Sequence, residues 1–315
     1  MVVVLYENEA WLAPLVSSLE KKSIAYELQF INGGQIDISL PPTPAVYINR
    51  MSPSSHTRGH MDGVRFVKEY LGVLEAHGLP VINGSDSFVF ELSKVRQHAA
   101  LEAFGIPTPR TIASIGIDNF REAAKSIAPP FITKHNQGGK GLGVQLFQSR
   151  EAFWNFLKED KYEASPDGVN LIQDYIKPAN AYITRVEIVD GQFLYAIRSS
   201  TSDGFELCPA DACAIDDAFC PVGEEANSGK FQLDESIHAG TPIVKQYIAF
   251  CRRYNIDVAG IEFVEDSDGM RYTYDINCTT NYNSAVEEKL GFSGMDFIVA
   301  LAEKRWKEHK INQKK

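Results

Sequence analysis

The sequence predicts an α+β protein, and three observations support that prediction. Strand-like and helix-like segments alternate from the first residues to about residue 88, which is the pattern of a small parallel α/β unit. Long strand-like segments dominate from Thr184 onward. Near the end, residues 260–277 form two strand-like runs joined at Asp268-Gly269, a dipeptide that favours a tight hairpin turn.

The first 88 residues are predicted to form a parallel α/β domain. Strands are expected at residues 2–6, 25–31, 45–48 and 80–83, with helices at 10–21 and 64–76 between them. No glycine-rich turn follows the first strand, so the fingerprint of a dinucleotide-binding domain is absent.

The remainder is predicted to contain two further lobes. A helix is expected from about Ser87 to Phe104, ended by Gly105 and Pro107, and strands and helices alternate from there to about Ile176. Strands at 184–189 and 192–198, a helix at 241–254, the hairpin and a last helix from about Gly294 follow. The expected lobes are residues 1–88, 89–176 and 177–315.

Composition excludes several classes of protein. With 315 residues, 44% apolar and 23% charged residues, the chain is typical of globular proteins. Its net charge of −10 argues against a nucleic-acid partner, which requires clustered basic residues. No apolar run reaches the length of a membrane span, and we expect a cytoplasmic protein. Five cysteines without paired C-x-x-C spacing, among them Cys208, Cys213 and Cys220, favour free thiols over disulfides or structural zinc.

The hairpin is predicted to bring two carboxylates together. With a two-residue turn at Asp268-Gly269, counting outward sets Glu262 opposite Asp275. Asn277 joins the same face, because side chains alternate along a strand. Opposed like charges repel, but two carboxylates and an amide oxygen suit Mg²⁺, which takes carboxylates together with substrate phosphates. The alternative is an acidic, solvated face of the sheet.

A glycine-rich segment lies midway along the chain. Gly138, Gly139, Gly141 and Gly143 surround Lys140, and such a run lets backbone N–H groups approach phosphate oxygens. Residues 144–147 return to a strand pattern, so the segment reads as a hairpin, unlike Rossmann and Walker loops, which open helices. A flexible surface hairpin is the alternative.

Two lysines are placed to add positive charge to a phosphate site. Lys134 ends the apolar strand before the glycines, where its ammonium would lie beneath bound phosphates. Lys94 lies on the helix that ends at Phe104 and would supply a second cation. For either lysine taken alone, an ordinary surface position is the alternative.

Taken together, four segments resemble the ATP-grasp fold. Ser93-Lys94 with residues 105–109 resembles its entry, residues 131–134 with 137–143 its second lysine and flexible loop, and residues 171–176 the strand whose backbone meets adenine. Glu262, Asp275 and Asn277 match its metal ligands. The resemblance covers about Lys94 to Asn281, and the chain is most similar to RimK-like carboxylate–amine ligases, which have a short N-terminal α/β domain.

The resemblance implies a ligase that forms an amide or peptide bond at the expense of ATP. A substrate carboxylate would attack the γ-phosphate to give an acyl phosphate and ADP, and an amine would then displace phosphate. The residues implied in ATP binding are Lys94, Lys134, Gly138, Gly139, Lys140, Gly141, Gly143, Gln173, Asp174, Tyr175 and Ile176. The glycine segment would close over the phosphates and exclude water. Glu262, Asp275 and Asn277 would hold Mg²⁺, or Mn²⁺ in its place.

Four arginines are candidates for contacts with substrate. Arg185 and Arg198 lie on the strands around Asp190-Gly191, and matching arginines of the resembled family face the reaction centre, where a guanidinium fork suits a carboxylate or acyl phosphate. Arg50 and Arg58 follow the third strand, at the end where ligands bind in open α/β sheets. The alternatives are exposed arginines and a solvated loop.

The sequence departs from the family pattern beside the acceptor site. Cys278 to Asn283 replaces the small-residue and Pro-Gly turn that often follows the metal-binding asparagine, and residues 201–229 match nothing in the glutamate ligases. The identities of the carboxylate and amine, each a small molecule or a peptide, therefore stay open, as does homo-oligomerisation. A regulatory protein that binds ATP without ligation is the alternative function, and a kinase or carboxylase of the same superfamily is a third.

Overall fold

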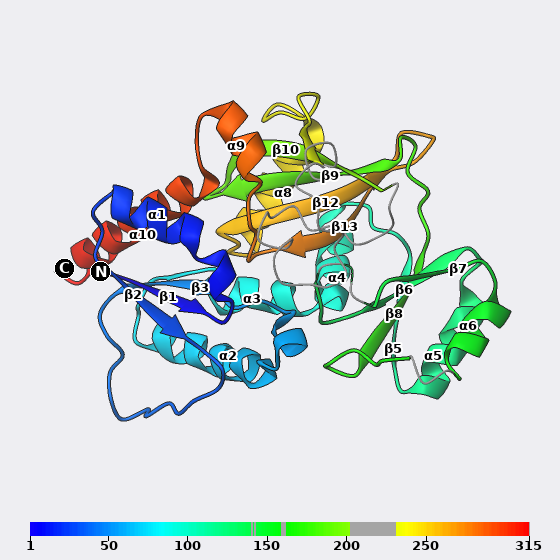
Figure 1. The fold of residues 1–315 in the computed structure, drawn as a ribbon, viewed down its shortest axis with the longest axis horizontal. Coiled ribbons are helices and arrows are strands. Elements are labelled where there is room, and N and C mark those ends of the chain that lie inside the picture. The colour runs from blue at the N-terminus through cyan, green and yellow to red at the C-terminus, as the bar shows by residue number, and fades with distance from the viewer. Residues whose placement is uncertain (140, 142, 159–161, 202–230, 315) are drawn as a thin grey trace.

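The protein is built around three separate sheets (Figure 1). The computed structural model describes residues 1–139, 141, 143–158, 162–201 and 231–314. Strand order is β2-β1-β3-β4 in the first sheet, β5-β8-β6-β7 in the second and β11-β10-β9-β12-β13 in the third. The expected α+β architecture is confirmed.

The first sheet is parallel and lies at the N-terminus. Its elements are β1 (Val2–Tyr6), η1 (Glu9–Trp11), α1 (Ala13–Lys21), β2 (Tyr26–Phe30), β3 (Val46–Arg50), η2 (Ser55–Arg58), α2 (Met61–Ala76) and β4 (Val81–Ile82). All strand pairs within it are parallel. One face is covered by α2, whose buried Val64, Val67 and Leu71 pack on Val3 and Leu5 of β1.

The other face of this sheet is covered jointly by the two ends of the chain. The C-terminal helix α10 (Gly294–Asn312) packs beside α1 (Figure 1). Leu15 of α1, Ile298 of α10 and Val4 of β1 belong to one buried cluster, which continues into the third sheet. Residues 1–88 and the end of the chain therefore share a hydrophobic core. Among the described residues, every helix is too short or too polar to cross a bilayer.

The second sheet carries the glycine-rich segment between two of its strands. Its elements are β5 (Thr111–Ile115), α5 (Ile117–Ala123), η3 (Ala124–Ser126), β6 (Phe131–His135), β7 (Gln145–Phe147), α6 (Arg150–Phe156) and β8 (Val169–Asp174). Phe120, Phe131, Phe147 and Phe153 pack edge-on or tilted against one another on its outer side. Lys134 of β6, opposite Leu171 of β8, occupies the inner side.

The helix expected from Ser87 to Phe104 is two helices, and that part of the prediction is wrong. α3 (Ser85–Leu92) ends where α4 (Lys94–Phe104) begins, because Ser93 adopts an extended conformation (φ −140°) and caps α4 by accepting a hydrogen bond from the Arg96 N–H. Asn136, at the end of β6, accepts hydrogen bonds from the N–H of Val95 and from the Ser93 hydroxyl. This break places Lys94 in the first turn of α4.

The third sheet is antiparallel and forms the C-terminal half of the molecule. It consists of β9 (Tyr182–Val189), β10 (Gln192–Ser200), β11 (Phe231–Leu233), β12 (Val258–Glu265) and β13 (Arg271–Asn277), with α8 (Pro242–Arg253) on one face and α9 (Ser284–Leu290) following the hairpin. α8 buries Val244, Tyr247 and Phe250 against this sheet. α4 lies on the same side, where the Phe104 ring contacts that of Phe250. The opposite face packs with α1, α10 and β1 of the N-terminal sheet in one buried cluster.

The β12–β13 hairpin reaches the predicted pairing by an unpredicted route. Glu262 lies opposite Asp275, as expected. The loop, however, is longer than two residues: Asp266 pairs with Met270, and Gly269 adopts φ 77°. Glu265 consequently pairs with Arg271, which is one position out of the expected register, and a β-bulge between Glu262 and Phe263 restores it. The extra residue on β13 is Tyr274.

A single asparagine joins the N-terminal sheet to the third sheet. Asn83 is buried (2% exposed) with φ 53°, a conformation that asparagine tolerates. Its amide donates to the carbonyls of Val258 (2.9 Å) and Cys278 (2.6 Å), and its carbonyl accepts from the N–H groups of Asp257 and Val258 (both 3.0 Å).

We expect Asn83→Ala to lower the free energy of unfolding by about 4 kcal/mol, because it leaves several buried backbone groups without partners. Urea denaturation of the two proteins measures the difference. Asn119→Ala, which removes one exposed hydrogen bond to the Ile115 carbonyl, is the control and should change stability by less than about 1 kcal/mol. Equal midpoints for Asn83→Ala and wild type would contradict the assigned role.

Candidate active site

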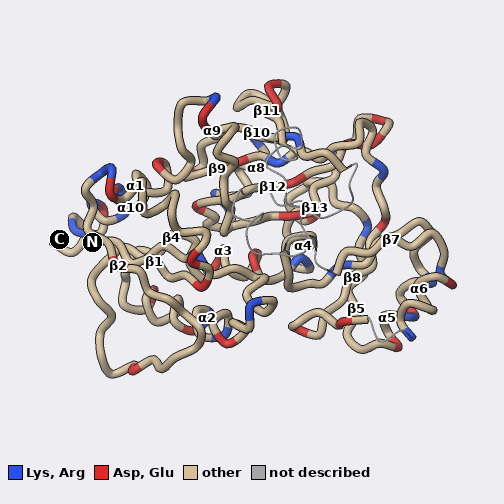
Figure 2. The backbone as a smooth tube through the Cα atoms, viewed as in Figure 1, with Lys and Arg blue, Asp and Glu red and all other residues tan. Residues whose placement is uncertain are grey.

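A cavity of about 420 Å³ lies between the second and third sheets. One end is apolar, lined by Ile132, Leu146, Ile176, Pro178, Ile183 and Val264. The other end is polar. Most of the site residues predicted from the sequence line the cavity as a whole: Lys94, Lys134, Gly138, Gly139, Gly141, Gln173, Asp174, Tyr175, Ile176, Arg185, Glu262, Asp275 and Asn277. Lysines and arginines are interspersed with acidic residues over all three sheets (Figure 2), so the charge of the site depends on local partners.

The predicted metal ligands share one face of the hairpin. Glu262 is opposite Asp275, and Asn277 is opposite Gly260. The Asn277 amide nitrogen lies 3.4 Å from both Asp275 Oδ2 and the Gly260 carbonyl. In the described part of the chain no three His, Cys, Asp or Glu side chains gather into a metal cluster, and the candidate set is two carboxylates and one amide. These hard oxygen donors fit Mg²⁺ that also binds substrate phosphates.

The pKa values of the two opposed carboxylates are shifted in opposite directions. Burial alone would raise the pKa of Asp275, but the charges of Lys94 and Lys134 outweigh burial and lower it. Lys94 Nζ lies 2.6 Å from Asp275 Oδ1. Burial raises the pKa of Glu262, with Arg185 acting in the opposite direction. A divalent cation between them would favour the charged form of both.

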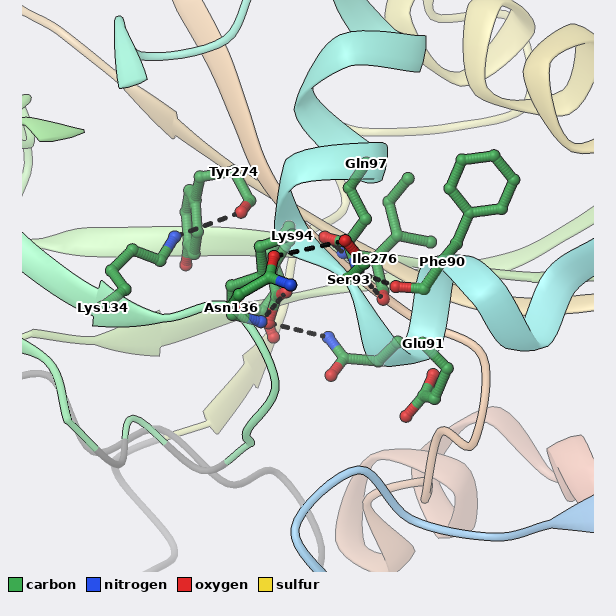
Figure 3. A network of polar contacts seen from close by, with 12 residues as sticks. Phe90, Glu91, Ser93, Lys94, Gln97, Lys134, Asn136, Tyr274 and Ile276 are labelled. Atoms are coloured by element: carbon green, nitrogen blue, oxygen red, sulfur yellow. Dashed lines mark hydrogen bonds and ion pairs between the residues drawn. The ribbon is translucent and has the colours of Figure 1, made fainter. Parts of the chain in front are cut away.

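Lys134 is a buried ammonium at the junction of the second and third sheets. Its side chain points toward Tyr274 (Figure 3), and Nζ donates to the Tyr274 carbonyl and to Gln173 Oε1, each at 3.3 Å. The ammonium also lies 5.3 Å from the centre of the Tyr274 ring. Burial, followed by repulsion from Lys94, lowers the pKa of Lys134 to about 8. Among the described residues, no carboxylate lies within salt-bridge distance of the Lys134 ammonium, which is also largely shielded from water. An anion bound in the cavity would compensate its charge.

A network of polar contacts joins the start of α4, which carries Lys94, to α3 and β13. Gln97 donates to the carbonyls of Phe90 (2.6 Å) and Ile276 (2.8 Å) and accepts from the Ile276 N–H (3.0 Å). Gln97 of α4 thereby reaches across the break to Phe90 of α3, and Figure 3 shows Asn136 beside Lys94. This network fixes the start of α4 against β13, so that Lys94 faces Asp275.

Arg185 also lines the cavity and lies on β9, the strand next to β12, which carries the candidate metal ligand Glu262. β9 pairs with β12 so that Arg185 is opposite Glu262 and Glu187 is opposite Gly260. A Cβ on Gly260 would lie 2.4 Å from Arg185 Nη2, so glycine there leaves room for the guanidinium. Burial would lower the pKa of Arg185, but Glu187 and Glu262 more than offset it and raise the pKa. The guanidinium therefore stays charged.

The floor of the cavity is the segment after β13, where the sequence departs from the family pattern. Arg50 is buried (5% exposed) and donates to the Thr280 carbonyl (2.8 Å) and to the Asn281 side chain. Glu91 of α3 accepts hydrogen bonds from the N–H groups of Cys278 and Thr279 and from the Thr279 hydroxyl. Burial raises the pKa of Glu91, and these hydrogen bonds oppose that rise. Arg50 holds the floor and does not line the cavity.

Two other predicted arginines lie away from the cavity. Arg198 pairs with Thr184 and so faces the opposite side of the sheet from Arg185, where its Nη2 donates to Asp234 Oδ1 (2.9 Å) and its guanidinium covers the Tyr182 ring. Arg58 forms an ion pair with the buried Glu7 and stacks on the Trp11 ring. Trp11 lines the cavity, so the contact of Arg58 with the site is indirect.

The glycine segment contributes Gly138, Gly139 and Gly141 to the lining of the cavity, although part of the segment is not described. Lys140 lies outside the described residues, as do Cys208, Cys213 and Cys220. Gly139 approaches Ser54 of the N-terminal domain, and Gly141 and Gly143 have φ values of 76° and 74°. A Cβ on Gly143 would lie 2.7 Å from the His135 ring. Gly143 lines a second cavity on the outer face of β6 instead of the main one.

Several residues that line the site were not predicted from the sequence. They are Trp11, Glu91 and Tyr274. Ser52 and Ser54, on the loop after the third strand, and Thr279 and Thr280, after the hairpin, also line the cavity and lie in segments that were expected near the substrates. Strand alternation puts Tyr274 on the face opposite Asp275, and only the bulge makes both line the cavity. The two threonines belong to a segment that the sequence marks as unusual, which was the available signal.

Comparison with protein families gives one match. Residues 92–206 match the model of the RimK-like ATP-grasp domain. The chain is 22% identical to beta-citrylglutamate synthase B of Danio rerio, over 74% of this chain and 53% of that protein. It is 26% identical to a probable alpha-L-glutamate ligase of Xylella fastidiosa (strain M12), over 48% of this chain and 54% of that protein. The chain thus matches only about half the length of each of these relatives.

Solved structures extend the likeness over the whole chain. D-cycloserine synthetase DcsG superposes with a TM-score of 0.67 at 19% identity, covering 97% of this chain and 100% of that one. D-alanine–D-alanine ligase from Bacillus anthracis superposes with a TM-score of 0.66 at 16% identity, covering 99% of each. At such identities the likeness shows the fold alone. The protein has the ATP-grasp fold, and its residues 92–206 match the RimK-like ATP-grasp domain.

Proposed function

We propose that the protein is an ATP-dependent carboxylate–amine ligase that forms an amide or peptide bond. The observation that carries the proposal is the pair Glu262 and Asp275, opposed on one face of the hairpin at the same end of the cavity as Lys94 and Lys134. Phosphoryl transfer requires this kind of charge arrangement more than covalent chemistry by the protein. The relatives beta-citrylglutamate synthase B and probable alpha-L-glutamate ligase are a synthase and a ligase by their names, which supports the proposal.

The proposed binding mode follows the two ends of the cavity. Adenine lies at the apolar end, between Ile132 and Val264, against the backbone of residues 173–176. The phosphates lie beside Lys94 and Lys134 under residues 138–143. The polar floor and the Trp11 wall take the carboxylate and the amine, as small molecules or peptides. The lobes 1–88, 89–176 and 177–315 are proposed to supply the acceptor wall, the nucleotide clamp and the metal face.

The proposed reaction proceeds in two steps. A carboxylate oxygen of the substrate attacks the γ-phosphorus of ATP, the bond to the β,γ-bridging oxygen breaks, and ADP leaves. The nitrogen of the amine then attacks the acyl carbon, phosphate leaves with the bonding electrons, and the nitrogen loses a proton. Lys94 and Lys134 neutralise phosphate oxygens, and Arg185 orients the reacting oxygens by its N–H groups. Arg198 has no part in this proposal.

Glu262, Asp275 and Asn277 are the residues proposed to hold Mg²⁺ or Mn²⁺. A cation held by these residues would neutralise negative charge on the phosphates. Without the cation, Lys94 forms an ion pair with Asp275. A cation on Asp275 would replace the lysine, which could then turn to a phosphate oxygen.

We expect release of ADP from Mg-ATP only when a suitable carboxylate is present. Pooled amino acids and small carboxylates, each with hydroxylamine as a surrogate amine, are incubated with the protein, and ADP and hydroxamate are measured together. Hydroxylamine traps an acyl phosphate whatever the natural amine is. ADP formed in proportion to hydroxamate supports the proposal. Tight ATP binding without ADP release across the panel favours the regulatory alternative, and absence of ATP binding refutes both.

A further inference from the structure

Glu187 is a buried carboxylate beside the candidate metal site for which the proposed function has no use. It is 1% exposed, and both of its oxygens are engaged. Oε1 accepts from Arg185 Nε at 2.7 Å, and Oε2 accepts from the Thr280 hydroxyl at 3.0 Å. Its strand position is opposite Gly260, the residue whose missing side chain makes room for the Arg185 guanidinium.

Arg185 is shared between Glu187 and a candidate metal ligand. Its Nη1 donates to Glu262 Oε1 at 3.1 Å, and its Nη2 donates to the Thr280 hydroxyl. One guanidinium thus faces two carboxylates, and the shorter contact goes to Glu187. Thr280 accepts from the arginine and donates to Glu187, which closes a ring of three residues beneath Glu262.

The arrangement matters because a buried arginine and a divalent cation compete for the same carboxylate. If Arg185 had Glu262 as its sole acidic partner, the pair would be electrically neutral, and metal binding would have to break or share it. With Glu187 also present, the group carries one more negative charge and Arg185 is anchored by a second partner. Glu262 can then turn an oxygen toward the cavity without leaving the guanidinium unpaired.

We propose that Glu187 is a positioning residue that keeps Glu262 available to the divalent cation by holding and neutralising Arg185. The proposal rests on the proposed function for the existence of the metal site. Glu187 and Thr280 would support that site indirectly, because they contact Arg185, which in turn contacts Glu262. Such supporting residues typically change metal affinity by about 10- to 100-fold.

The test measures Mn²⁺ binding, so no substrate needs to be known. The free ion is followed by electron paramagnetic resonance while Mn²⁺ is titrated into protein saturated with ADP. We expect Glu187→Gln, which keeps the shape and removes the charge, to weaken Mn²⁺ binding by about 10-fold or more. Glu265→Gln on β12, the strand that carries Glu262, removes an ion pair with Arg271. It is the matched control and should bind Mn²⁺ like wild type.

A double-mutant cycle tests whether Glu187 acts through the arginine. Arg185→Gln removes the competing cation, and we expect adding Glu187→Gln to it to change Mn²⁺ affinity by less than about threefold. Thr280→Val removes the hydroxyl that links Arg185 to Glu187 without altering charge, and it should also weaken Mn²⁺ binding. This variant replaces Glu187→Gln in the test if circular dichroism shows that Glu187→Gln does not fold.

The outcomes separate this inference from the proposed function. Wild-type Mn²⁺ affinity in both Glu187→Gln and Thr280→Val overturns the inference. An undiminished effect of Glu187→Gln in the Arg185→Gln background overturns the positioning role, because the charge would then act directly. Wild-type protein that binds neither ADP nor Mn²⁺ refutes the proposed function itself.

Discussion

Asp275→Asn is expected to lower ATP-dependent turnover by about 1,000-fold, since a cation bridge to phosphates contributes several kcal/mol to the transition state. Asp275 is the carboxylate of the pair whose pKa is lowered, by Lys94 and Lys134 against burial. Asparagine keeps the size of the side chain and removes its charge. The measurement is the rate of ADP release at saturating Mg-ATP with the best carboxylate from the panel.

The control for this variant lies on the same hairpin. Asp268→Asn changes an exposed carboxylate in the β12–β13 loop and should keep wild-type turnover. Added Mn²⁺ at high concentration is expected to recover part of the Asp275→Asn activity, because Glu262 and Asn277 remain. Turnover in Asp275→Asn within threefold of wild type would remove Asp275 from the metal site.

Lys134→Met is expected to reduce turnover by about 100- to 1,000-fold while making the nucleotide-free protein more stable. Burial and repulsion from Lys94 lower the pKa of Lys134 to about 8 in the folded protein, against its ordinary value of 10.5. Folding must therefore work against protonation of this lysine at neutral pH, at a cost of up to about 3 kcal/mol. After loss of the weak contacts to Gln173 and Tyr274, we expect a net gain of about 2 kcal/mol at pH 7.

The pH dependence of this gain has a definite sign. Because the unfolded chain binds the Lys134 proton more tightly than the folded protein, wild type gains stability relative to Lys134→Met as the pH rises from about 8 to 10.5. Urea denaturation of both proteins at pH 7 and pH 10 measures the gap, which should shrink at the higher pH. Lys125→Met, at a largely exposed lysine, should show no such change. A gap that widens with pH would contradict the assigned protonation.

Local patterns were sufficient for much of this molecule. Alternation and turn residues located β1, α2 and the β12–β13 hairpin, and the apolar strand expected to end at Lys134 is β6. The opposition of Glu262 and Asp275 was predicted from a two-residue turn, whereas the structure has a longer loop and a compensating bulge. Turn type and bulges depend on backbone energies that differ little between alternatives, so sequence patterns seldom decide them.

The remainder depends on contacts between residues distant in the sequence. The break at Ser93 is stabilised by Asn136 from another sheet, and Arg50 finds its partners more than two hundred residues later, at Thr280 and Asn281. The opposite orientation of Arg198 follows from the pairing of β10 with β9. None of these contacts has a signature within its own segment.

The extra residue on β13 has a consequence for aligning this chain with its relatives. Tyr274 occupies no position in the regular pairing, so a relative with a plain strand there would align with a gap of one residue. Such a relative would keep its two carboxylates opposed, since the pairing on either side of the gap is unaffected. It would lack the ring beneath Lys134 and the carbonyl that accepts from it. Relatives with this extra residue should therefore hold the lysine that corresponds to Lys134 by such contacts, and relatives without it should not.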